Sequence, residues 1–327
     1  MTQKKIKFSI LGLVYFFCHC AYSTDITLSS PSTTAVTLSG AGVSHTYTNN
    51  SSLNVSNADA IFIYDALGAT INFTYTGAKG SLLKSTWDNG EALYAPQITG
   101  IFTVNNDGQI ITTGRSGNPI YVPSSVVDSI VINNTTNGII RGGDTNNFGA
   151  IYILYSPLAT LSNDGTIDGG TAPAINAVSI GNMTLTNTGV METSSITAAV
   201  RIRSTIASIN NSGTIENSGT SEEGGISVDS SSTISNLTNS GTISGNSAIY
   251  NTGTITNLVN SGTISNANRV GIYNPGTITT LTNAVGGIIS DSGGSLGAIY
   301  NDPTASIVTF NNAQGGDSST ASKTALV

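Results

Sequence analysis

The feature that most constrains this chain is a repeated phrase of the form Leu-x-Asn-x-Gly-x-Ile. It is cleanest as LTNSGTI from Leu237 and LVNSGTI from Leu258. Other copies, several of them degraded, start at Val104, Ile132, Leu161, Leu185, Ile209, Leu281 and Phe310. Successive copies begin 21 to 29 residues apart. Helical-hairpin repeats keep a nearly fixed period, whereas stacked β coils tolerate loops of any length. The uneven spacing therefore favours β coils.

Each repeat contains two further short phrases. AIYN or GIYN occurs at Ala248, Gly271 and Ala298, and GTI follows at Gly253 and Gly276. Three strands per repeat, separated by Gly, Asn and Ser turns, correspond to one triangular coil. We therefore predict an all-β parallel β-helix (a solenoid) of three-strand coils with about 21–29 residues per coil.

Strand alternation assigns the aliphatic residues of each repeat to the interior. Because coils stack, equivalent residues should form columns along the axis. One predicted inward column is Ile175, Val200, Ile226, Ile249, Ile272 and Ile299. A second is Leu161, Leu185, Ile209, Leu237, Leu258 and Leu281. The tyrosines of the AIYN phrases should point outward.

The repeated asparagine follows a strand at a corner of each coil. An amide has two donors and one acceptor, so stacked copies can bond each other and the turn backbone. This predicts a structural ladder of Asn163, Asn187, Asn211, Asn239, Asn260 and Asn283, with a shorter one of Asn251, Asn274 and Asn301. The glycine two residues later is expected to take a positive φ at the bend. A ligand site at these amides is the less favoured alternative.

The composition excludes several other classes of protein. Only 9% of residues are charged, too few for the solvent faces of amphipathic helices, yet 38% are hydrophobic, which argues against disorder. Removal of Lys4, Lys5 and Lys7 with an N-terminal signal would leave 8 basic against 18 acidic residues, a balance of −10. Nucleic acids and anionic membrane surfaces are therefore unfavourable partners.

The first residues are typical of a secretory signal peptide. Three lysines precede the apolar run Phe8 to Phe17, and Ala21-Tyr22-Ser23 provides small residues for cleavage after Ser23. The run is too short for a membrane anchor, which needs about 20 apolar residues. Cleavage would remove both cysteines, Cys18 and Cys20, and so exclude disulfides and thiol chemistry.

We predict four segments. Residues 1–23 form the signal peptide, and residues 24–103, which lack the clean phrase, form an N-terminal cap with irregular β coils. Residues 104–310 form the β-helix repeats, and the small polar residues 311–327 form a linker. The role of the region around Trp87 is left open.

Few residues could carry chemistry. After cleavage the only histidine is His45, which we expect at the surface, and no cluster has metal-ligand spacing. We predict no cofactor and no metal. Candidate binding residues are Tyr250, Tyr273 and Tyr300 in one outward column, and the charged residues Arg201, Glu222 and Glu223, grouped with Arg203 and Asp229. Arg201 should occupy the outward slot that Tyr250 holds later. The plainer interpretations are a structural tyrosine stack and solvated ion pairs.

The signal, the cysteine-free remainder and coils of the form LxNSGTIxG…AIYNxGTI resemble the passenger domain of a bacterial autotransporter, over residues 104–310. The resemblance implies a right-handed β-helix, displayed on or released from the outer membrane of a Gram-negative bacterium and often serving adhesion. Members of that family end in a membrane β-barrel, which this sequence does not contain, so the membrane is a partner only through a barrel missing from this chain. We expect a monomer that is periplasmic unless a barrel is supplied.

Two function classes follow from the sequence. The first is a non-catalytic surface or adhesin-like protein that contacts a host protein or glycan. The alternative is a polysaccharide-binding or polysaccharide-cleaving β-helix enzyme, since carboxylates and arginine share one expected face. The low charge content and the lone histidine favour the first.

Overall fold

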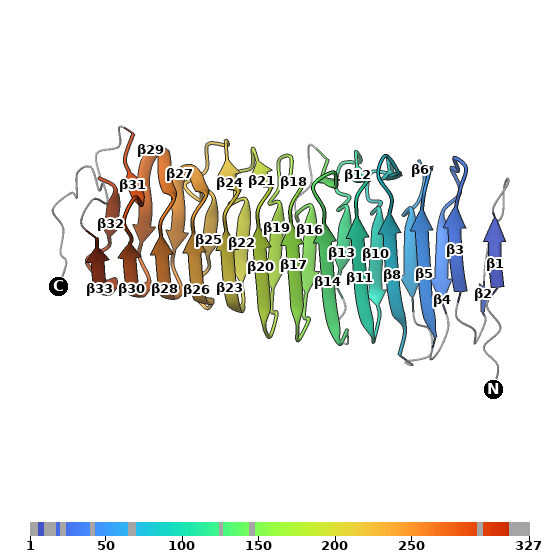
Figure 1. Cartoon of the computed structure of the whole chain (residues 1–327), viewed down its shortest axis with the longest axis horizontal. Coiled ribbons are helices and arrows are strands. Elements are labelled where there is room, and N and C mark those ends of the chain that lie inside the picture. The colour runs from blue at the N-terminus through green and yellow to red at the C-terminus, as the bar shows by residue number, and fades with distance from the viewer. Residues whose placement is uncertain are drawn as a thin grey trace.

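The chain folds into one continuous parallel β-solenoid of about 10 turns, seen in a computed structural model (Figure 1). The structure describes residues 6–9, 18–19, 24–39, 43–64, 70–123, 127–143, 148–292 and 297–313. These residues contain strands, turns and bends but no helix, and hence no helix that could span a membrane. The predicted fold class, an all-β parallel β-helix with three strands per coil, is confirmed.

Three ladders of parallel strands make the three faces of the solenoid. Face 1 consists of β1 (Ile6–Ser9), β3 (Thr24–Leu28), β5 (Ser44–Asn49), β8 (Asn72–Gly77), β11 (Ile101–Asn106), β14 (Ser129–Asn134), β17 (Ala159–Asn163), β20 (Met183–Asn187), β23 (Thr205–Asn211), β26 (Thr233–Asn239), β28 (Thr254–Asn260), β30 (Thr277–Asn283) and β33 (Ser306–Asn312). Face 2 consists of β6 (Ser52–Val55), β9 (Leu82–Ser85), β12 (Gln109–Thr112), β15 (Ile139–Arg141), β18 (Thr166–Asp168), β21 (Val190–Thr193), β24 (Thr214–Asn217), the first halves of β27 (Thr242–Asn251) and β29 (Thr263–Asn274), and β31 (Ile288–Ser290). Face 3 consists of β2 (Cys18–His19), β4 (Val36–Ser39), β7 (Ile61–Tyr64), β10 (Leu93–Gln97), β13 (Ile120–Val122), β16 (Ile151–Leu154), β19 (Ile175–Val178), β22 (Val200–Arg203), β25 (Ile226–Val228), the second halves of β27 and β29, and β32 (Ile299–Asn301).

The chain visits faces 1, 2 and 3 in that order and then starts the next coil. In Figure 1 the face 1 strands run upward in front, the strands behind run downward, and each coil lies to the left of the one before. This sense of winding makes the solenoid right-handed. Every described strand pair is parallel, because each strand pairs with its counterpart one coil away.

The inward columns have the predicted register. On face 3 Ile249 pairs with Ile272, and on face 1 Leu237 pairs with Leu258. The face 1 column also continues toward the N-terminus through Ile132 and Val104. These side chains are fully buried and belong to one core that runs the length of the solenoid. One coil cannot bury its aliphatic residues alone, so stacking is what forms this core.

The corner asparagines form a continuous ladder of amide–amide hydrogen bonds. The Nδ2 of each donates to the Oδ1 of the next at 2.8–3.0 Å. Besides the six expected residues, the ladder includes Asn106, Asn134 and Asn312. From Asn106 to Asn283 each amide nitrogen also donates to backbone carbonyls, as Asn187 does to Gly189 and Thr214. The ladder thus supplies partners for these amides, which are almost fully buried.

The glycine two residues after each corner asparagine is required for a different reason from the positive φ that we expected. Positive φ is found at Gly80, Gly149, Gly170, Gly245, Gly286 and Gly297, and not at the corner glycines Gly165, Gly189, Gly213, Gly241 and Gly262. A Cβ on Gly213 would overlap the carbonyl oxygen of Gly189 in the preceding coil, and the same holds along the column. The expectation of positive φ is wrong, because close approach of stacked turns is what requires glycine there.

The coils continue in register into the region before residue 104. Strand β8 pairs with both β5 and β11, so the strand pairing of face 1 crosses that boundary without a break. The asparagine ladder does not, because Gly77 occupies its position in β8. Asn49 Nδ2 instead donates a hydrogen bond to the hydroxyl of Tyr75 at 3.3 Å. A tyrosine hydroxyl thus fills the place of an amide, which explains why the repeated phrase is not recognisable here.

His45 is buried, and the surface position that the sequence predicts for it is wrong. Only 2% of the residue is exposed, and it lies in an inward column with Phe73 and Phe102. Burial lowers its pKa, and neither ring nitrogen has a hydrogen-bond partner among the described residues. The alternation of β5 places His45, Tyr47 and Asn49 inside together.

Two sequence predictions fall largely outside the described residues. Of the predicted signal peptide only Ile6–Ser9 and Cys18–His19 are described, as β1 and β2. Of the predicted linker, Asn311 and Asn312 continue β33, and residues 314–327 lie outside the described part. Cleavage after Ser23 stays a prediction.

Candidate functional site

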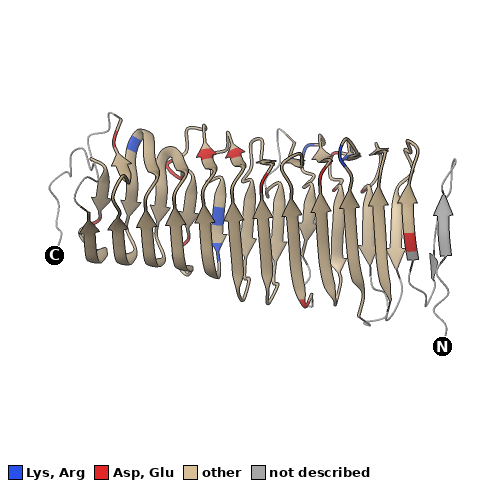
Figure 2. Cartoon of the chain, viewed as in Figure 1, with Lys and Arg blue, Asp and Glu red and all other residues tan. Residues whose placement is uncertain are grey.

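The outward side chains of face 2 bring five charged residues and one isoleucine together in one column. In register order the column is Lys84, Ile111, Arg141, Asp168, Glu192 and Glu216. Each step is one strand spacing, about 4.8 Å. The column changes from positive to negative at Arg141 and Asp168. Figure 2 shows how few other charged residues the described solenoid carries.

Two shallow hollows lie side by side along this column. The first, of about 350 Å³, is lined by Lys84, Ile111, Thr112, Thr113, Arg141, Gly142 and Gly143, and we call it the basic hollow. The second, of about 200 Å³, is lined by Asp168, Glu192, Thr193, Ser194, Glu216 and Ser218, and we call it the acidic hollow. One ion pair separates them.

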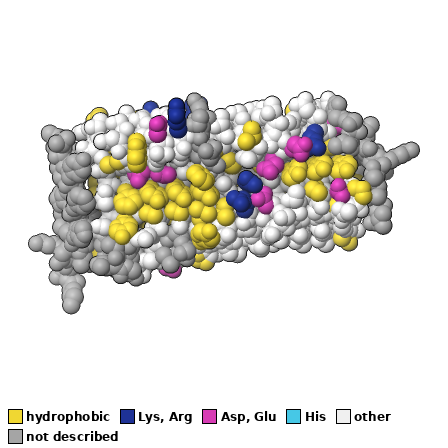
Figure 3. Space-filling model, turned by 180° about the vertical axis from the view of Figure 1, so that it is seen from behind, with side chains coloured by type: hydrophobic (Ala, Val, Ile, Leu, Met, Phe, Trp, Pro, Cys, Tyr) yellow, Lys and Arg dark blue, Asp and Glu magenta, His cyan; other side chains and the backbone are white. Residues whose placement is uncertain are grey.

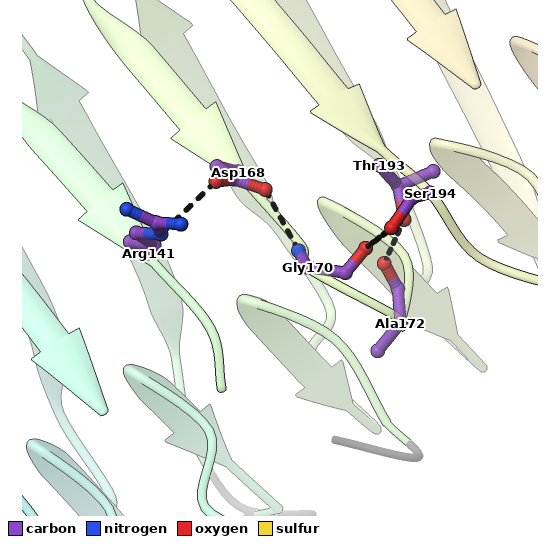
Figure 4. Close-up of polar contacts among 6 residues, drawn as sticks. All are labelled: Arg141, Asp168, Gly170, Ala172, Thr193 and Ser194. Atoms are coloured by element: carbon purple, nitrogen blue, oxygen red, sulfur yellow. Dashed lines mark hydrogen bonds and ion pairs between the residues drawn. The ribbon is translucent and has the colours of Figure 1, made fainter. Parts of the chain in front are cut away.

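That ion pair and the turn next to it are shown in Figure 4. Arg141 Nε lies 3.1 Å from Asp168 Oδ2, and Asp168 Oδ1 accepts the backbone N–H of Gly170 at 2.8 Å. The hydroxyls of Thr193 and Ser194 donate to the Gly170 carbonyl at 3.0 Å, and Thr193 also donates to Ala172. The turn is therefore fixed, and with it the position of Asp168 between the hollows.

The acidic hollow sets three carboxylates on adjacent strands. Like charges directly opposite each other on neighbouring strands are destabilising. Partial burial raises the pKa of Glu192, and the charges of Asp168 and Glu216 raise it further, while Arg141 lowers it. Glu192 thus holds its proton more readily than an ordinary glutamate, because it lies between two other carboxyls.

The predicted tyrosine column exists on face 3. Tyr250, Tyr273 and Tyr300 stack with ring centroids 5.1 and 5.0 Å apart and planes within 15°. Arg269 lies 5.0 Å from the centroid of the Tyr273 ring. Stacked rings turn their faces toward each other, so a ligand meets their edges and hydroxyls.

The predicted charged residues separate into two groups. Arg201 occupies the outward slot of Tyr250, two coils earlier. Arg201 Nη2 and Arg203 Nε both lie 3.2 Å from Asp229 Oδ2. Glu222 instead pairs with Arg269 at 2.8 Å.

Glu223 completes the set of predicted charged residues. Its backbone N–H donates to Ser221, and its carboxylate has a buried oxygen without a hydrogen-bond partner among the described residues. The arginine pair and Glu222 therefore form separate ion pairs, with Asp229 and with Arg269.

A second aromatic column, which the sequence analysis missed, occupies the same outward position in the earlier coils. Phe62, Tyr94, Tyr121 and Tyr152 follow one another with centroids 5.1 to 5.4 Å apart. Asn176, Arg201 and Ser227 fill the slots between the two columns. Figure 3, which views the solenoid from behind, shows these two stretches of hydrophobic side chains with charged groups between them.

The half-buried Asp59 and the buried Glu91 form a pair of carboxyls beside Tyr94 of this second aromatic column. Asp59 Oδ1 accepts the backbone N–H of Glu91 at 2.9 Å, and Asn118 Nδ2 donates to Glu91 Oε1 at 3.4 Å. Glu91 is only 8% exposed. Burial, helped by the hydrogen bond and charge of Asp59, raises the pKa of Glu91 to about 8. At neutral pH this site therefore retains a proton.

Sequence reasoning missed the face 2 column, although a signal for most of it was present. Ile111, Arg141, Asp168, Glu192 and Glu216 each directly follow the final aliphatic residue of the repeated phrase. Aligning that position across copies would have found them. Lys84 lies in a coil without the phrase, so only the strand register reveals it.

The fold and these columns define the chain as a parallel β-solenoid with outward arrays of charged and aromatic side chains. No group of three or more His, Cys, Asp or Glu side chains in the described part is arranged to hold a metal ion. Comparison with known proteins found no matching family model, no matching curated sequence and no matching solved structure.

Proposed function

We propose that this chain is a non-catalytic, exported β-solenoid that acts by binding, as a surface or adhesin-like protein of a Gram-negative bacterium. The observation that carries the proposal is the register: about ten coils hold their outward side chains in straight columns along one axis. A rigid array of this kind suits contact with an extended partner. Export rests on the signal-like N-terminus, and the autotransporter relationship rests on the resemblance of the repeats.

The arrangement of the predicted charged residues also supports binding over catalysis. Arg201 and Arg203 are neutralised in part by Asp229, and Glu222 is engaged by Arg269. Catalysis requires groups that converge on one reacting atom. Paired ions spread along a face instead stabilise the loops that carry them.

The test is binding of the purified protein to host cells and to immobilised glycans and surface proteins, with product analysis of the same polysaccharides. We expect saturable binding and unchanged chain lengths. An absence of saturable binding to cells, glycans and proteins alike would contradict the proposal. The export hypothesis is tested separately, by N-terminal sequencing of the protein recovered from the bacterial envelope, where we expect Thr24 as the first residue.

The acidic hollow favours one alternative, cleavage of a polysaccharide. Two carboxyls on adjacent strands, one with a raised pKa, provide an acid and a base of the kind that hydrolyses glycosidic bonds. Glu192 would be the acid and Asp168 or Glu216 its partner. This alternative predicts that Glu192→Gln abolishes product formation without weakening binding. If the unmodified protein shortens no polysaccharide, the alternative fails.

A further inference from the structure

We propose that the basic hollow on face 2 is a binding subsite for a saccharide unit that carries an isolated carboxylate or sulfate group. The inference rests on the proposed binding function and names the chemical class of the ligand. The subsite lies between β9, β12 and β15, with Lys84 and Arg141 at its two ends and Ile111 between them.

The two cations are available to a ligand. Lys84 lines the hollow and has no ion-pair or hydrogen-bond partner among the described residues. Arg141 is 58% exposed and contacts Asp168 only through Nε. Its two terminal nitrogens therefore face no partner in the described part and can bind an oxyanion in the planar, two-pronged manner that guanidinium groups favour.

The residue between the cations suits a sugar ring. The half-buried side chain of Ile111 projects outward one strand from each of them. An apolar surface flanked by hydrogen-bond donors is the usual composition of a small-molecule site, and about 350 Å³ lies within the usual size of such sites. The C–H face of a pyranose would lie on Ile111, with its charged substituent toward Lys84 or Arg141.

Spacing and charge restrict the ligand further. Lys84 and Arg141 are two strand steps apart, about 9.6 Å, which is about the length of a disaccharide. A polymer that is charged on every unit, such as a nucleic acid, would extend its next anions over Asp168, Glu192 and Glu216 and be repelled. A saccharide with one anionic group per disaccharide places only half as many anions over that acidic row and is repelled less.

The experiment is calorimetric titration of the full-length protein with three hexasaccharides at low and at physiological salt. Hyaluronan hexasaccharide carries only carboxylates, a keratan sulfate hexasaccharide carries only sulfates, and N-acetylchitohexaose is neutral. We expect binding of at least one anionic probe, at least tenfold tighter than the neutral one and weakened by salt. The two anionic probes distinguish carboxylate from sulfate as the group that is bound.

Matched variants assign the binding to the hollow. Lys84→Gln and Arg141→Gln should each weaken the anionic probe at least tenfold, while Arg141→Lys keeps the charge and part of the affinity. Arg203→Gln is the control for Arg141, because Arg203 also forms an Nε–Asp ion pair, at 3.2 Å, on another face and is 45% exposed. Circular dichroism confirms that each variant is folded.

Three outcomes would overturn the inference. The neutral and anionic probes could bind with equal affinity, or no probe could bind at all. Arg203→Gln could also lower the affinity for the anionic probe as much as Arg141→Gln does. Each leaves the proposed function to be decided independently by the assays on cells, glycans and surface proteins. If those assays show saturable binding while the hexasaccharides fail, the protein is a binding protein whose ligand does not use the basic hollow.

Discussion

Asn251 donates its Nδ2 to Asn274 Oδ1 at 2.6 Å, while its own Oδ1 is buried without a hydrogen-bond partner among the described residues. The reason is the preceding coil, where the equivalent position is Val228, which has no amide to donate. The short ladder therefore begins with an unsatisfied acceptor. In the long ladder, by contrast, Asn187 both accepts from Asn163 and donates to Asn211.

This difference predicts unequal costs for the same substitution. Asn187→Leu deprives Asn163 Nδ2 of its acceptor in the next coil and Asn211 Oδ1 of its donor, and we expect the free energy of unfolding to fall by about 2–4 kcal/mol. Asn251→Leu breaks one amide–amide bond but removes an acceptor that is already unsatisfied. We therefore expect the free energy of unfolding to fall by only about 1–2 kcal/mol. Urea unfolding followed by circular dichroism measures both. Equal losses would show that ladder continuity does not determine the energy.

The corner glycines provide a second prediction. Gly213→Ala places a Cβ against the Gly189 carbonyl, so the coils must move apart, and we expect a loss of about 3 kcal/mol or more. The control is Gly80→Ala, where φ is 77° but nothing lies within 4 Å of the added carbon. We expect that change to cost about 1–2 kcal/mol, from backbone strain alone. Thermal unfolding that ranks Gly80→Ala as the more damaging change would contradict this explanation of the repeat.

The pairing of Glu91, which is buried, with Asp59 predicts a dependence of stability on pH. The unfolded chain releases the Glu91 proton near pH 4.5, whereas the folded protein holds it to about pH 8. The folded state binds more protons between these values, so the free energy of unfolding should fall as pH rises through this window. Glu91→Gln cannot ionise and should lack this fall.

The measurement is the melting temperature from pH 4.5 to 9 for the unmodified protein and the variant. His45 acts in the opposite direction, because its lowered pKa means that stability is lost as pH falls below about 6.5. Since both proteins contain His45, the difference between their curves isolates Glu91. The exposed Asp88, changed to Asn, serves as a control that should keep the slope. Parallel curves for Glu91→Gln and the unmodified protein would reject the prediction.

The tyrosine stack on face 3 allows a test of structural against binding roles. Tyr273 lies between two rings and Tyr300 has one described neighbour. If the stack is structural, Tyr273→Ala should cost about 1 kcal/mol more than Tyr300→Ala in unfolding experiments, because it loses one more stacking contact. Ligand affinity should stay unchanged in both. A loss of affinity in a folded Tyr273→Ala protein would instead make the stack part of the binding surface.

The sequence by itself determined the fold and the main inward columns. Residues such as Ile249, Ile272, Leu237 and Leu258 recur because a stacked coil places identical environments one above another, so the period of the core is written directly in the chain. The corner asparagines could be predicted for the same reason, since an amide can bond its own copy in the next coil. Local alternation and repetition were sufficient for these features.

Only the tertiary structure decided what lies outside or departs from the repeat. Three such features depend on how neighbouring coils approach each other. They are the close contact of Gly213 with Gly189, the burial of His45, and the Tyr75 hydroxyl in place of an amide. The face 2 column was equally hidden, because residues 27 apart, such as Arg141 and Asp168, become neighbours only through strand register. Outward positions are free of the packing constraint that makes the core repeat, so their order along the axis becomes visible only once the coils are stacked.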